Sequence, residues 1–176
     1  MDFLPKGYKP QENEGTSKYL KLKAGDNLVR ILSKPVIGYV AWKDKQPNRA
    51  KDVQNLTDNY DSNPKEFWAI VCYCYDSQSV CIWEITQKTI LKAITSLSND
   101  KAWGSPLKYD LKITRTGEDL QTEYQVSPYP HRETPDKVKD EFKATSINLE
   151  ALFTGDNPFE EKKEVNIMDS SNDLPF

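Results

Sequence analysis

Aromatic and basic side chains recur together between residues 30 and 83, and this combination is suited to holding single-stranded nucleic acid. Aromatic rings stack on the flat faces of bases whatever the base sequence, each contributing about 1–3 kcal/mol. Lysine and arginine neutralise the phosphates and release counterions. The residues expected to bind in this way are Arg30, Lys34, Tyr39, Trp42, Lys43, Lys45, Arg49, Lys51, Phe67, Tyr73, Tyr75 and Trp83.

The segment 66–75, EFWAIVCYCY, offers two faces for such stacking. In a strand, successive side chains point to opposite sides, so Trp68 lies on one face and Tyr73 and Tyr75 on the other. Because tyrosine hydroxyls favour water, the tyrosine face is predicted to point outward. The alternative is that these rings, Trp68 above all, fill the core.

The three cysteines and the single histidine suggest a metal site at first sight. Zinc takes four ligands, and His131 lies far along the chain from Cys72, Cys74 and Cys81. We therefore expect small buried thiols, with no metal and no cofactor. The chain contains neither a GxxxxGK[ST] phosphate loop nor an HExxH motif, and His131 has no obvious nucleophile beside it. The sequence predicts a protein that is not an enzyme.

The last residues, Asp173, Leu174, Pro175 and Phe176, form a second candidate binding element. An apolar ring beside carboxylates is suited to a basic pocket on a partner protein. Residues 156–176 hold six acids and two lysines, whereas residues 1–52 hold 11 basic and 6 acidic side chains. A basic front with an acidic tail is typical of nucleic-acid-binding proteins, even though the net charge is −3.

The order of expected elements follows from the periodicity of apolar residues. Alternation predicts strands, a spacing of three and four predicts a helix, and Thr86 is the expected N-cap. The elements are one bent strand or two strands in line over 27–42, a polar loop over 43–65, a hairpin of 66–75 and 79–85, a helix over 86–100, and a second hairpin of 108–116 and 120–126.

This order favours a mainly β chain that forms a five-stranded OB barrel with a helix between its third and fourth strands. An SH3-like barrel is the closest rival, but the helix before the last hairpin favours the OB arrangement. The predicted organisation is an N-terminal arm over 1–17, the OB domain over 18–127, a helical extension over 128–154, and a disordered acidic tail over 155–176.

Three short segments resemble bacteriophage-encoded single-stranded DNA-binding proteins. They are MDFLPKGY at 1–8, Phe67-Trp68-Ala69, and EITQK at 84–88, and the tip is similar to that of bacterial-type single-stranded DNA-binding proteins. The resemblance covers residues 1–127 and the tip. It implies an OB fold that coats single-stranded DNA without sequence preference during replication, recombination and repair. It also implies that the tip recruits replication proteins such as a polymerase, helicase or primase.

We therefore expect a cytoplasmic single-stranded DNA-binding protein, located in the cytoplasm of the bacterial host if a phage encodes it. No apolar leader begins the chain, no membrane partner is expected, and the few cysteines fit a reducing compartment. One alternative is an RNA-binding OB module, because stacking does not read the 2′-hydroxyl. Another is an adaptor that binds only protein and keeps its aromatic residues in the core.

Overall fold

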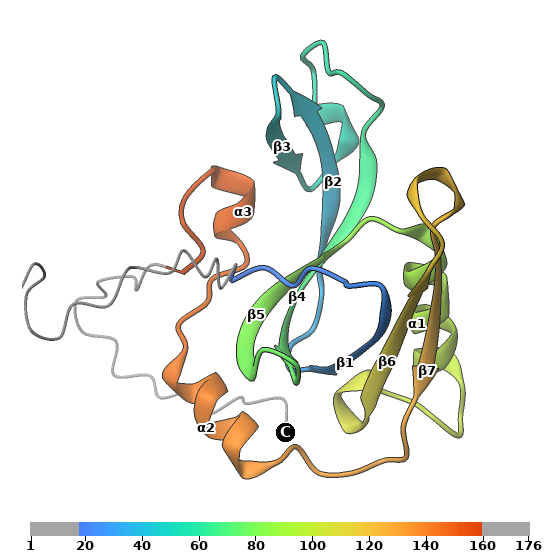
Figure 1. The fold of residues 1–176 in the computed structure, drawn as a ribbon. Helices are drawn as coiled ribbons and strands as arrows, with labels where there is room; N and C mark the ends of the chain where they lie inside the picture. Colours follow the sequence, from blue (N-terminus) through green and yellow to red (C-terminus); the bar gives the residue numbers. More distant parts are fainter. Residues whose placement is uncertain (1–17, 160–176) are drawn as a thin grey trace, which may run out of the picture.

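A computed structural model describes residues 18–159 of the chain (Figure 1). The expected N-terminal arm over 1–17 and the expected docking residues Asp173–Phe176 lie outside the described residues. None of the helices in the described range is long and apolar enough to cross a membrane.

Seven strands form the body of the described chain, so the expectation of a mainly β protein is confirmed. The strands are β1 (Gly25–Ile31), β2 (Val36–Lys43), β3 (Gln46–Ala50), β4 (Lys65–Cys74), β5 (Ser79–Ile85), β6 (Asp110–Thr116) and β7 (Glu123–Pro128). The helices are α1 (Lys88–Asn99), α2 (Asp136–Ala144) and α3 (Ala151–Thr154), with short 3-10 turns η1 (Val53–Asn55), η2 (Pro106–Lys108) and η3 (Asp119–Gln121).

The strands form one open antiparallel sheet in the order β3-β2-β4-β1-β6-β7, and β5 pairs with β4 outside this path. The length of β4 explains why it pairs with three other strands. Its first half pairs with β2, its last residues pair with β1, and its other edge pairs with β5 over Trp68–Cys74. Within the described residues β5 and β7 are not paired, so hydrogen bonds do not close the sheet into a barrel.

The segment over 27–42 is two strands, β1 and β2, separated by residues 32–35, which is the second of its two expected forms. Three other local expectations need correction. The polar segment over 43–65 is not loop throughout, because it begins with β3, which forms a hairpin with β2. Helix α1 starts at Lys88 with Gln87 as its N-cap, so Thr86 is not the cap. The strand expected over 120–126 is shifted to 123–128 by η3.

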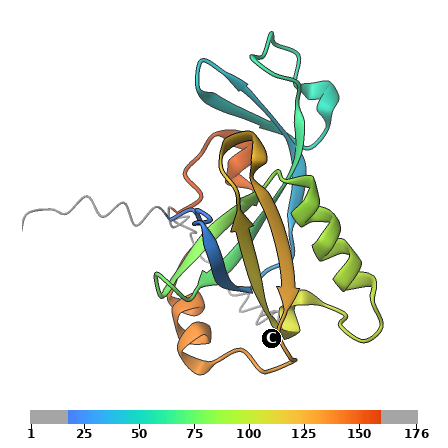
Figure 2. The same cartoon turned by 45° about the vertical axis from the view of Figure 1, so that its right-hand side comes forward.

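Strand β4 is buried on both faces, and this arrangement decides which side chains are accessible. On one face Ile70 and Cys72 pack with residues of β1, β5, β6 and α1. On the other, Phe67 and Tyr73 pack with residues of the C-terminal segment, including Val138 of α2. Figures 1 and 2 show α1 on one side of the sheet, near β6 and β7, and α2 and α3 on the opposite side, α2 near β5 and α3 near β3. The expected extension over 128–154 therefore shares its core with the sheet.

Gly38 of β2 lies at a close approach between the sheet and Phe153 of α3. A Cβ atom at this position would lie 2.6 Å from Cε1 of Phe153 and 2.7 Å from the carbonyl oxygen of Ala50. The backbone there needs the absence of a side chain rather than an unusual dihedral angle. Gly38 therefore lets Phe153 cover the beginning of the β2–β3 hairpin.

We predict that Gly38→Ala lowers the free energy of unfolding by about 1–3 kcal/mol, because it overpacks this contact. Urea denaturation measures the change. In the double variant with Phe153→Ala, the penalty of the added methyl group should shrink, since the nearest ring is gone. A penalty that is the same with and without Phe153 would contradict the contact as its cause.

Candidate functional site

Four of the residues expected to bind are buried. Phe67, Tyr73, Trp83 and Arg30 expose 1–2% of their surface. The prediction that the tyrosine face points outward is therefore wrong, because α2 and α3 cover it. Trp83 pairs with Ile70 and lies in the core on the other face of the sheet.

Arg30 is held in a buried polar network around Asp110. Its guanidinium lies 3.4 Å from Oδ1 of Asp110 and donates to the carbonyl oxygens of Leu107 (2.8 Å) and Arg132 (2.9 Å). Arg132 donates from Nε to the other carboxylate oxygen of Asp110 at 2.8 Å. Arg30 therefore joins β1 to η2 and to the segment after β7. Its exposed fraction of 1% excludes direct contact with a nucleic-acid strand bound at the surface.

Tyr75 completes this network from the half-buried end of the hairpin. Its hydroxyl donates to Oδ1 of Asp110 at 2.8 Å and accepts from Arg132 at 2.9 Å. Burial, followed by the hydrogen bond to Asp110, raises the pKa of Tyr75 to about 12. Tyr75 is thus committed to the fold as a neutral hydrogen-bond donor.

We predict a loss of stability between pH 10 and pH 12 that depends on Tyr75. A folded-state pKa of about 12 lies above the usual value of about 10, so the contribution is complete below pH 10 and disappears as the pH rises through 12. The melting temperature of Tyr75→Phe should decline less steeply over this range than that of the unaltered protein. Parallel declines would contradict a role for the phenol.

Arg49 and Lys51 of the expected phosphate-binding set are both paired with carboxylates, although the side chain of Lys51 remains 62% exposed. Arg49 forms an ion pair with Glu84 at 2.6 Å and its guanidinium carbon lies 5.9 Å from the centre of the Phe67 ring. Lys51 forms an ion pair of 2.9 Å with Glu150, the N-cap residue of α3. Burial raises the pKa of Glu84, while Arg49 opposes that shift.

The remaining expected residues are accessible, and several share one face. Register pairs Ile37 with Trp68, and the alternation along β2 places Tyr39 and Lys43 on that same side. Trp42 is 44% exposed, but the same alternation puts it on the other side of β2. Lys45 is exposed in the turn between β2 and β3.

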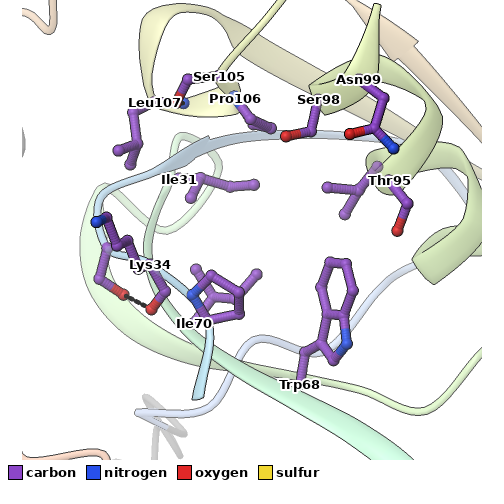
Figure 3. A pocket seen from close by; sticks show the side chains of 13 residues that line it. Ile31, Lys34, Trp68, Ile70, Thr95, Ser98, Asn99, Ser105, Pro106 and Leu107 are labelled. Atoms are coloured by element: carbon purple, nitrogen blue, oxygen red, sulfur yellow. Dashed lines mark hydrogen bonds between the residues drawn. The ribbon is translucent and has the colours of Figure 1, made fainter. Parts of the chain in front are cut away.

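Trp68 borders a hollow in the described structure (Figure 3). This hollow has a volume of about 390 Å³ and lies between α1, η2 and the segment that joins β1 to β2. The indole ring points into it toward Thr95 of α1, and Lys34 lies on the opposite side. Ile31 and Ile70 supply an apolar floor, so a flat apolar group would be held between a ring and aliphatic side chains.

Most hydroxyls at the rim of this hollow are already engaged in local hydrogen bonds. Ser33 accepts from the backbone of Val71 at 2.9 Å, Thr95 donates to the carbonyl of Leu91 at 2.7 Å, and Ser105 accepts from Leu107 at 3.3 Å. They fix the walls. The groups left for a ligand are the exposed polar side chains that line the same hollow, Ser98 and Asn99 near the end of α1 and Lys34 across from them.

A second hollow of about 380 Å³ lies beside the first and shares Trp68 and Thr95 with it. It adds Lys92 from α1 and Glu66 from β4, and the indole nitrogen of Trp68 donates to Oε1 of Glu66 at 3.4 Å. The two hollows together form a groove along α1, which we call the Trp68 groove. Its two lysines, Lys34 and Lys92, stand at opposite ends with the ring between them.

Lys34 is the expected residue that lines this groove, whereas the lining residues Lys92 and Asn99 were not predicted, nor was the exposed neighbour Ile37. Ile37 is 50% exposed, which is unusual for a large apolar residue in a strand beside the core. The sequence does carry a signal for the α1 wall, because polar Lys92, Thr95 and Asn99 alternate with its buried positions. That spacing predicts an exposed helix face, but it does not predict the hollow between this face and Trp68 of β4.

The cysteines give no sign of a metal site in the described part of the chain, where no cluster of three potential ligands occurs. Cys72 and Cys81 face each other across β4 and β5 with their sulfur atoms 3.6 Å apart. The hydrogen bond with Cys81, followed by burial, raises the pKa of the Cys72 thiol. Comparison of the chain with protein-family models, curated proteins and solved structures finds no match.

Proposed function

We propose that the protein binds single-stranded DNA, with the strand lying in the Trp68 groove. The observation that carries the proposal is the half-buried indole of Trp68, whose ring borders a hollow of about 390 Å³ between two exposed lysines. Base stacking on an aromatic ring tolerates any sequence, and lysines neutralise the phosphates on either side. This agrees with the resemblance to bacteriophage-encoded single-stranded DNA-binding proteins.

The connectivity of the strands supports an OB-type arrangement for this site. In this interpretation β1 and β2 together form the bent first strand, β4 and β5 the second and third, and β6 and β7 the last two, with α1 before them. OB folds bind oligonucleotides near the second and third strands and the loops after the first and fourth. Here α2 and α3 cover the outer face of β4, so we place the DNA on the other face, on the side of Trp68 and Tyr39.

The accessible residues among those predicted to bind nucleic acid extend the groove toward the β2–β3 hairpin. Ile37 and Tyr39 continue the face of Trp68, and Lys43 follows at the end of β2. A strand that passes Trp68 would therefore meet an apolar and aromatic surface and then a cation. Titration with labelled oligo-dT of graded length, followed by fluorescence anisotropy, tests the proposal directly. Absence of binding would contradict it, and equal affinity for oligo-rU would change the ligand to single-stranded nucleic acid in general.

We predict that oligo-dT binding weakens linearly with the logarithm of salt concentration, and that the double variant Lys34→Gln, Lys43→Gln flattens the slope by about 1.4. Each phosphate neutralised on a single strand contributes roughly 0.7 to that slope. Lys51→Gln is the control, because Lys51 pairs with Glu150 on the opposite side of the sheet. If Lys51→Gln flattened the slope as much per residue, the strand would not lie in the Trp68 groove.

A further inference from the structure

A separate hollow of about 430 Å³ lies on the other side of η2 from the Trp68 groove, and Leu107 of η2 lines both. Lys108 contributes to it from η2, and Arg132 and Thr134 contribute from the segment between β7 and α2. None of the functional arguments above uses this hollow, which we call the Arg132 pocket.

Positive charge predominates around the Arg132 pocket. Two guanidinium groups, Arg30 and Arg132, share the single carboxylate of Asp110, which leaves one of the two charges uncompensated in this network. Lys108 adds a further exposed cation to the lining, and Glu133 is an exposed carboxylate of the same lining. Because Arg30 is buried, its charge is weakly screened, and the surplus around the pocket favours an anionic ligand.

The walls of the pocket are held in place by Arg30. The same amino group donates to the carbonyls of Leu107 and Arg132, which belong to two lining segments that are also joined by the hydrogen bond from the Arg132 amide to the Lys108 carbonyl. Arg30 is too deep to touch a ligand, so it is a positioning residue. Arg132 uses Nε and one amino group on Asp110 and Tyr75, and its side chain is 50% exposed. A planar guanidinium fixed on one side in this way is prepared to present its remaining donors to an oxyanion.

Two buried polar atoms of the lining residues have no hydrogen-bond partner within the described residues. They are the hydroxyl oxygen of Thr134 and Nε of Arg30. Thr134 is only 4% exposed, and a buried hydroxyl without a partner is destabilising because it has lost its hydrogen bonds to water. A ligand with several acceptor oxygens would supply the missing partner for Thr134. The feature is independent of the charge surplus and indicates the same class of ligand.

We propose that the Arg132 pocket binds a phosphate group, with Arg132 and Lys108 as the cationic contacts and Thr134 as a hydroxyl donor. The source can be a free phosphate or a backbone phosphate of a strand that leaves the Trp68 groove over η2. The second source rests on the proposed function, whereas the pocket itself does not.

The test is a titration of the full chain, free of nucleic acid, with inorganic phosphate at constant ionic strength, followed by amide chemical shifts in two-dimensional NMR. We expect saturable shifts of the Lys108 and Thr134 amides. Lys108→Gln and Thr134→Val should each weaken binding by about tenfold, as expected for the loss of a hydrogen bond to a charged group. Lys143→Gln removes the same charge from the exposed end of α2 and should leave the affinity unchanged.

Three outcomes would overturn the phosphate pocket: no saturable shift, equal shifts with sodium acetate, or equal weakening by Lys143→Gln. A repeat with saturating oligo-dT identifies the source. If the strand already occupies the pocket, inorganic phosphate no longer shifts these amides, and Lys108→Gln also reduces the salt slope of oligo-dT binding by roughly 0.7. If phosphate binds as before, the pocket serves free phosphate. Phosphate binding without any oligo-dT binding would uphold the pocket and contradict only the proposed function.

Discussion

Asp110→Asn is expected to lower the free energy of unfolding by about 3–5 kcal/mol, the largest stability effect that this structure predicts. The carboxylate is 4% exposed and receives Arg30, Arg132 and the hydroxyl of Tyr75. Removing its charge leaves the guanidinium of Arg30 buried without a counterion. Because domains are stable by only about 5–15 kcal/mol, the variant should unfold at a much lower urea concentration.

Asp26→Asn is the matched control for this experiment. Asp26 is exposed and accepts a hydrogen bond of 2.8 Å from Thr114, so its substitution should change the stability by no more than about 0.5 kcal/mol. The double variant Arg30→Met, Asp110→Asn should be less destabilised than the sum of the two single variants, because neither buried charge remains. Equal effects of the Asp26 and Asp110 variants would contradict the network as described.

Trp68→Ala is expected to weaken oligo-dT binding by about 1–3 kcal/mol, or roughly 5-fold to 150-fold, because one base loses its stacking partner. Trp68→Phe keeps an aromatic ring and should retain most of the affinity. Anisotropy of a labelled oligonucleotide measures both. A melting curve for each variant separates this effect from unfolding, since Trp68 also packs against the core.

Trp42→Ala provides the control for the Trp68 prediction. Trp42 is 44% exposed, yet it lies on the side of β2 opposite Tyr39. Its loss should change the affinity by less than a factor of about two if the strand follows the Trp68 groove. A large loss in Trp42→Ala together with a small one in Trp68→Ala would move the binding surface to the other face of the hairpin.

The elements with strong local signals were predictable from the sequence. The apolar runs of β4 and β5 flank a short polar turn, and Ile90, Leu91 and Ile94 recur at the spacing of a helix. Such signals depend only on neighbours along the chain. Strand β3 has no such signal, because its residues QPNRA carry no apolar alternation. Its hairpin also turns through Asp44 and Lys45 at φ values of 50° and 63°, without the usual Asn-Gly or Asp-Gly pair.

The exposed face of β4 was not predictable, because distant residues decide it. Tyr73 has an alternation that fits either face, and its burial depends on Val138 in a helix that follows the whole sheet. The burial of Arg30 also depends on a distant residue, since its counterion Asp110 lies 80 positions away in the sequence. The preference of a tyrosine hydroxyl for water is weak compared with the stabilisation gained when α2 buries the apolar surface of this face. Trp68 remains accessible because α1 and η2 leave a hollow beside it.

The position of Val138 and Leu152 over Phe67 has a consequence for the chain as the ribosome makes it. Residues of β4 leave the ribosome well before the residues that cover them. At about 5–20 residues per second, the delay between β4 and α3 is several seconds or more. During that interval the nascent protein carries a bare, β-prone apolar segment, of the kind that chaperones bind. Premature termination before α3 would make this exposure permanent, so truncated products should aggregate where the finished chain does not.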